Sequence, residues 1–149
     1  MKKLLIRTIF LMLVLYTSSQ AQGIESRKFG IGFMIGSPTG ISLKYWLNEV
    51  NALTGGISLE NKGGIQINYL WHSFEAIRVT DGRLPIHYGF GAQSQFDDHT
   101  ILGLRGVVGL TYIFERSPFD IFCELAPLLE IGNDAEFRLT ASAGARYYF

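Results

Sequence analysis

The chain has 149 residues, enough for one domain, and carries 13 basic and 13 acidic side chains. This balance gives no reason to expect nucleic acid or another highly charged partner. The single cysteine, Cys123, excludes an internal disulfide, and the 17 glycines and 13% aromatic residues are typical of many strands joined by tight turns.

The N-terminus predicts export. The first seven residues include two lysines and an arginine, and residues 4–16 are mostly apolar. Ser19 and Ala21 follow, and they are the small residues that a signal peptidase prefers before its cleavage site. The alternative, a membrane-anchoring helix, is disfavoured because the apolar run is too short. We therefore expect residues 1–21 to be a cleaved signal peptide and residues 22–149 to form one domain.

Beyond residue 22 the sequence contains no apolar stretch near the roughly 18 residues that a membrane-spanning helix needs. It does contain strand-sized runs of alternating character, separated by glycine, proline, asparagine and aspartate. The short breaks favour an antiparallel meander, and an even count of eight is the smallest size of bacterial outer-membrane barrel. The strands are expected near residues 29–36, 40–47, 52–60, 64–72, 84–93, 101–114, 119–131 and 137–149.

The last of these runs shows the alternation most clearly. Every second residue from Phe137 to Phe149 is apolar or aromatic, and Arg138 and Arg146 fall on the opposite side. None of the apolar faces predicted for the other strands carries a charge, as expected of side chains that face lipid. The sequence therefore predicts an all-β, eight-stranded antiparallel up-and-down transmembrane β-barrel.

Charged side chains on the opposite faces would lie in the lumen, where they need partners. A soluble barrel such as a lipocalin would reverse the arrangement, with apolar residues inside. We expect Glu124 to pair with Arg105, Arg146 or Lys44. The predicted lumen charge network comprises Lys44, Arg105, Glu124, Arg138 and Arg146.

Aromatic residues gather at the strand ends that share a rim with both termini. Such crowding is typical of a girdle at the membrane interface, here the periplasmic one. The connections at the other rim, near residues 37–40, 60–64, 94–100 and 132–136, are short for outward-facing loops. The expected girdle includes Tyr45, Trp46, Tyr69, Trp71, Tyr112, Phe114 and Tyr147.

Several stretches carry a family resemblance: Gly36-Ser37-Pro38-Thr39-Gly40, Lys44-Tyr45-Trp46, Tyr69-Leu70-Trp71-His72, Gly82-Arg83-Leu84-Pro85, Tyr88-Gly89, Leu104-Arg105-Gly106-Val107-Val108-Gly109 and Gly144-Ala145-Arg146-Tyr147-Tyr148-Phe149. They resemble a family of small uncharacterised bacterial outer-membrane β-barrel proteins, similar in size to the eight-stranded OmpA-type membrane domain. The resemblance covers nearly the whole mature chain and implies an outer-membrane location and this fold, but no activity. It also implies that Tyr147 and Phe149 form the C-terminal signal read by the outer-membrane assembly machinery.

Residues for chemistry are few. His99, beside two aspartates and near Ser94, could activate a hydroxyl for acyl transfer, although a polar loop tip is the simpler interpretation. The three histidines lack the spacing of metal ligands, so no metal and no cofactor is expected. Cys123 falls on a predicted lipid face, where it would act as a small apolar side chain.

These observations favour a structural or interaction barrel, not an enzyme, with its lumen plugged by the charge network. The alternatives are an outer-leaflet lipid-modifying enzyme centred on His99 and a narrow pore. The expected partners are outer-membrane lipid and, during biogenesis, the assembly machinery. The sequence does not identify an extracellular or envelope protein partner.

Overall fold

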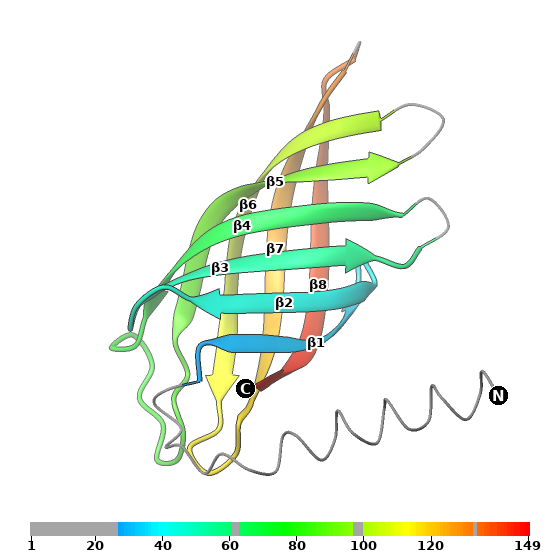
Figure 1. Cartoon of the computed structure of the whole chain (residues 1–149). Helices are drawn as coiled ribbons and strands as arrows, with labels where there is room; N and C mark the ends of the chain where they lie inside the picture. The colour runs from blue at the N-terminus through cyan, green and yellow to red at the C-terminus, as the bar shows by residue number, and fades with distance from the viewer. Residues whose placement is uncertain (1–26, 61–62, 97–99, 133) are drawn as a thin grey trace, which may run out of the picture.

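The computed structural model describes residues 27–60, 63–96, 100–132 and 134–149. Eight antiparallel strands follow one another in chain order and close into a barrel, because β1 pairs with both β2 and β8 (Figure 1). The predicted fold class is confirmed. The strands are β1 (Phe29–Gly36), β2 (Gly40–Trp46), β3 (Asn51–Ser58), β4 (Gly64–Ser73), β5 (Ile86–Phe96), β6 (Thr100–Ile113), β7 (Phe119–Ile131) and β8 (Glu136–Tyr148).

The predicted strand positions differ from these by at most three residues. The largest difference is at β5, which was expected over 84–93 and extends from Ile86 to Phe96. Pro85 lacks an N–H group, so β5 begins after it, and its carbonyl accepts a hydrogen bond from Thr111 N at 3.1 Å. No helix within the described ranges is long and apolar enough to cross a membrane.

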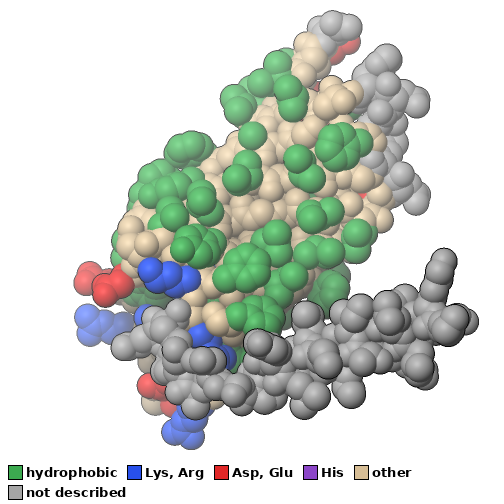
Figure 2. All heavy atoms as spheres, viewed as in Figure 1, with side chains coloured by type: hydrophobic (Ala, Val, Ile, Leu, Met, Phe, Trp, Pro, Cys, Tyr) green, Lys and Arg blue, Asp and Glu red, His purple; other side chains and the backbone are tan. Residues whose placement is uncertain are grey.

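Side chains alternate between the outside and the inside of the barrel as the sequence predicted. On β4, Ile65 and Ile67 are exposed while Gln66 and Asn68 are buried. No outward position on any of the eight strands carries a charged side chain. Figure 2 shows apolar side chains spread over the visible wall, with most of the visible charges gathered at one end. The exterior is therefore an apolar band, and the polar groups lie inside.

The end of the barrel that holds the C-terminus also carries the connections 47–50, 74–85 and 114–118. The chain end is tied to this rim, because Phe149 N donates to Phe29 O at 2.9 Å and Tyr148 N donates to Pro118 O at 2.8 Å. The opposite rim carries the connections 37–39, 59–63, 97–99 and 132–135, none of which approaches the length of 74–85. This division of the connections matches the sequence prediction.

Inward-facing glycines make room for large side chains on neighbouring strands. A Cβ added to Gly30 would lie 2.8 Å from the ring of Tyr148, and one added to Gly144 would lie 2.7 Å from the ring of Phe122. An eight-stranded interior is only wide enough for side chains to fill, so each large group needs a small neighbour. The glycines of this chain thus help to pack the lumen as well as to form its turns.

This packing can be tested with a matched pair of substitutions. Gly30→Ala should destabilise the barrel by about 1–3 kcal/mol, the usual cost of overpacking, because the new methyl group meets the Tyr148 ring. Gly55→Ala should have little effect, since its nearest neighbours would lie 3.7 Å or more away. Urea unfolding of the refolded proteins in lipid vesicles measures both. Equal effects would contradict the packing assigned to Gly30.

Candidate functional site

The largest cluster of buried polar groups lies in the lumen near the rim that holds the C-terminus, with Asp120 of β7 at its centre. Asp120 Oδ1 accepts a hydrogen bond from Arg146 Nε at 3.0 Å, and Oδ2 accepts one from the Tyr148 hydroxyl at 2.5 Å. Lys44 Nζ lies 3.9 Å from Oδ2. One fully buried carboxylate therefore connects β7, β8 and β2, and it faces two buried cations.

A second set of contacts extends this cluster across β4. Lys44 Nζ lies 2.9 Å from His72 Nε2, and His72 Nδ1 lies 3.1 Å from the carbonyl of Val50. An ammonium group can only donate, so His72 Nε2 accepts and Nδ1 carries the proton that is donated to Val50. His72 is thus assigned as a neutral imidazole held between a cation and a backbone carbonyl.

His72 is directly opposite His87 of β5, and His87 in turn contacts the second buried carboxylate, Glu124. His87 Nε2 lies 3.3 Å from Glu124 Oε1, and His87 Nδ1 lies 3.0 Å from the Thr111 hydroxyl. Glu124 was expected to pair with Arg105, Arg146 or Lys44. Instead its direct contact is His87, because Asp120 lies directly across from Arg146 in the β7–β8 register and takes that place.

Two aromatic rings complete the cluster. The Arg146 guanidinium lies 3.9 Å from the centre of the Phe122 ring, and Lys44 Nζ lies 4.2 Å from that of Trp46. Trp46 also contacts His72, with 4.4 Å between ring centres. Trp46 was expected in the interfacial girdle, but these contacts place it at the lumen, as the strand parity requires. The rings supply further favourable surroundings for the two buried cations.

Arg105 of β6 occupies the other half of the lumen. Its guanidinium donates to the side-chain oxygens of Gln66 and Gln93, the latter at 3.0 Å. Among the described residues no carboxylate lies within ion-pair distance of it. The glutamines of β4 and β5 therefore solvate this buried cation from two sides, a pattern that charge alone does not reveal.

Arg138 is the predicted network member that lies apart from the others. Its side chain is 44% exposed and its Nη2 lies 3.2 Å from Glu130 Oε1 near the outer rim. Lys44, Arg105, Glu124 and Arg146 are buried in the lumen, but Arg138 and Glu130 form a separate pair at its mouth. The charges thus form an inner cluster, an isolated Arg105 and a rim pair.

The expected girdle residues other than Trp46 lie on the outside near the rim of the C-terminus, and many of them touch. Ring centres are 4.7 Å apart for Tyr69 and Trp71, and 4.8 Å apart for Tyr112 and Phe114. Tyr147 contacts both Phe119 and Phe149, at 5.0 and 4.9 Å. Tyr45 is 45% exposed on the same side. The aromatic groups therefore cluster around this rim.

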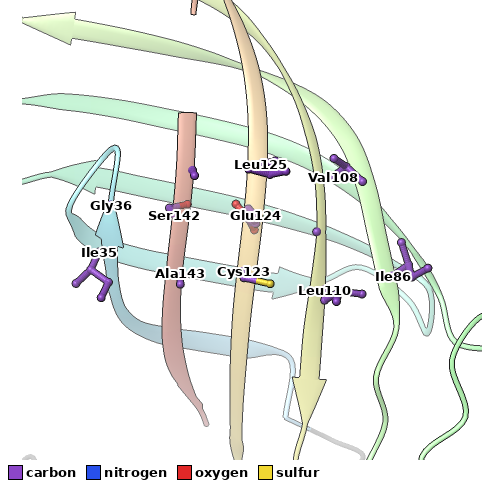
Figure 3. Close-up of a pocket in the computed structure, with 12 residues that line it drawn as sticks. Ile35, Gly36, Ile86, Val108, Leu110, Cys123, Glu124, Leu125, Ser142 and Ala143 are labelled. Carbon is purple, nitrogen blue, oxygen red and sulfur yellow. The ribbon is translucent and has the colours of Figure 1, made fainter. Parts of the chain in front are cut away.

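The outer wall also has an apolar groove of about 690 Å³ where the outward side chains of β7 and β8 are small (Figure 3). Cys123, Ala141 and Ala143 leave this space between Ile35 on one side and Leu110 on the other. The surface of this groove is almost entirely apolar. Cys123 here is an exposed small side chain of the apolar wall.

No group of three or more histidine, cysteine, aspartate or glutamate side chains in the described part of the chain has the arrangement of a metal site. His99, on which the lipid-modifying hypothesis depends, lies outside the described residues. Ser94, its expected neighbour, is on β5.

The fold and this site define a class, the closed eight-stranded antiparallel barrel with an apolar exterior and buried charged side chains inside. This agrees with the OmpA-type resemblance at the level of the fold. Among solved structures, the chain is similar to the N-terminal β-barrel domain of Pseudomonas aeruginosa OprF, with 17% identity over 82% of this chain and 96% of that chain, at a TM-score of 0.47. No family description matches the chain, and no curated protein matches its sequence.

Removing the central carboxylate should cost much more stability than removing the rim pair. Asp120→Asn leaves Arg146 and Lys44 buried without their anion, and we expect a loss of about 3–5 kcal/mol. Arg138→Gln breaks a partly exposed pair and should cost about 0–1 kcal/mol. Unfolding in urea, followed by tryptophan fluorescence, compares the two variants. A loss for Asp120→Asn no larger than that for Arg138→Gln would contradict the role assigned to Asp120.

Proposed function

We propose that this chain is an integral outer-membrane β-barrel protein with a structural or interaction role, and that its lumen is plugged by the charged network. In this proposal residues 1–21 direct export and are removed, and Tyr147 and Phe149 serve as the signal for barrel assembly. Its partners are outer-membrane lipid and, during biogenesis, the assembly machinery.

One observation carries the membrane assignment: no outward strand position is charged, whereas Lys44, Asp120, Glu124 and Arg146 are buried inside. In water this arrangement would expose a continuous apolar wall, far larger than the patches found on soluble monomers. In a bilayer the same wall meets acyl chains, and the aromatic groups near one rim lie at the headgroup level. The arrangement supports a membrane as the surrounding solvent.

The buried polar network supports the plugged form over the pore. Arg105 reaches from β6 to glutamines on β4 and β5, and the Asp120 cluster connects β7, β8 and β2. Buried polar side chains thus project into both halves of the lumen. Since eight strands enclose little more than their own side chains, such a network leaves no continuous aqueous path for a solute.

A charge on the outer wall tests the membrane assignment. Leu125 is 50% exposed in the middle of β7. Leu125→Arg should destabilise the barrel in lipid vesicles by about 2–4 kcal/mol, the cost of an arginine near the bilayer midplane. Leu125→Ala is the control for the lost side chain and should cost clearly less. An arginine variant as stable in vesicles as the alanine variant would contradict a lipid-facing β7.

Measurements of ion conductance test whether the lumen is plugged. The wild-type protein in planar bilayers should give no large, stable channel currents. Arg105→Ala removes a large side chain buried in the lumen and should increase ion leakage, whereas Arg138→Ala acts at the rim and should not. Large steady conductance of the wild type, in a preparation whose electrophoretic mobility shifts on boiling, would contradict the plugged form and favour the pore.

A further inference from the structure

The barrel closes where β1 pairs with β8, and along this seam β8 extends further toward the outer rim than β1 does. The ladder between β1 and β8 ends at the pair Gly36–Ser142, but the ladder between β7 and β8 continues to Glu130–Glu136. From Glu136 to Thr140, β8 therefore has a strand neighbour on one side only. This segment, which we call the β8 edge, spans roughly 17 Å at the usual rise per residue.

β8 extends further because β1 turns away. Gly36 has φ +120°, a conformation that favours glycine, and Thr39 closes the turn through its hydroxyl, which lies 3.2 Å from Gly36 N and 3.0 Å from Gly36 O. Thr39 O in turn accepts a hydrogen bond from Leu59 N at 2.9 Å. The β1–β2 turn is thus fixed toward β3, away from the β8 edge. In Figure 1 the β7–β8 hairpin projects at the top, beyond that turn.

The backbone N–H and C=O groups that point outward from the β8 edge, away from β7, belong to its odd-numbered residues. Ala141 O accepts the last hydrogen bond across the seam, from Ser37 N at 2.8 Å. Because backbone groups of successive residues point to opposite edges of a strand, the N–H and C=O of Phe137 and Leu139 point to the same open side. Such an unpaired row is a template for one more strand.

The side chains of the β8 edge also have a pattern. Phe137 and Leu139 are outward and 70% and 63% exposed. On the other face Glu136 is directly opposite Glu130, and Glu130 is already paired with Arg138. Within the described residues Glu136 has no basic partner, so this face has one acidic group in excess. A strand that carries a basic residue across from Glu136 would balance it.

We propose that the β8 edge binds an extended segment of another protein, which adds to the sheet as an antiparallel strand. The bound segment has a basic side chain across from Glu136 and apolar side chains across from Phe137 and Leu139. This rests on the proposed outer-membrane function and identifies the surface and partner chemistry of its interaction role. A second copy fits poorly, because β8 strands of two barrels in one membrane run in the same direction.

The test uses the full chain refolded in detergent micelles and a fluorescent heptapeptide of alternating valine and threonine, in which one threonine is replaced by lysine so that no lysine need lie across from Arg138. A second peptide has glutamate in place of lysine. We expect saturable binding of the lysine peptide and at least about tenfold weaker binding of the glutamate peptide. Leu139→Pro removes one N–H of the open edge without touching the β7 ladder, and should weaken binding about tenfold. Leu139→Ala keeps the N–H and is the matched control.

Glu136→Lys is a second, independent variant, and it should reverse the preference between the two peptides. The proposal is overturned by a folded barrel that binds neither peptide, by equal affinity for both, or by Leu139→Pro binding as well as Leu139→Ala. If Leu139→Pro does not fold, the reversal by Glu136→Lys decides alone. Each sample must show a mobility shift on boiling, so a failed barrel is distinguished from a barrel that does not bind.

Discussion

The fold depends on burying one carboxylate, Asp120, among cations from other strands. Arg146 of β8 and Lys44 of β2 would be costly in the lumen without an anion, and Asp120 supplies it at 3.0 and 3.9 Å. The Tyr148 hydroxyl binds the other side of the same carboxylate. Arg146 and Tyr148 lie on β8, which pairs with β7 directly, but Lys44 lies on β2, which approaches β7 only when β1 closes on β8. The contact between Lys44 and Asp120 therefore favours closure of the barrel.

The apolar exterior and the charged interior are two results of one alternation. A strand that presents Ile121 and Cys123 to the outside must present Asp120, Phe122 and Glu124 to the inside. A shift of one residue in the register would put these carboxylates on the apolar wall and the aliphatic groups in the lumen. The pairing register of β7 and β8 is therefore fixed from both faces.

The sequence predicted all eight strands and the facing of β2, β4, β6, β7 and β8, because alternation is a local signal that each strand carries by itself. It did not predict that Asp120 is the central anion, or that Glu124 contacts His87. Those pairings depend on which residues of separate strands lie opposite one another, and the stagger of a closed barrel decides this. Trp46 shows the same limit: its position near a rim suggested the girdle, but its parity directs it to the lumen beside Lys44 and His72.

The chain has two tryptophans, Trp46 at the lumen and Trp71 on the outer wall, and they allow the most direct test of the inside-out arrangement. Each is measured alone, in the Trp71→Phe and Trp46→Phe variants, by fluorescence in vesicles of lipids with brominated acyl chains. The arrangement predicts strong quenching of Trp71 and little quenching of Trp46. Equal quenching of the two, or quenching of Trp46 alone, would contradict it.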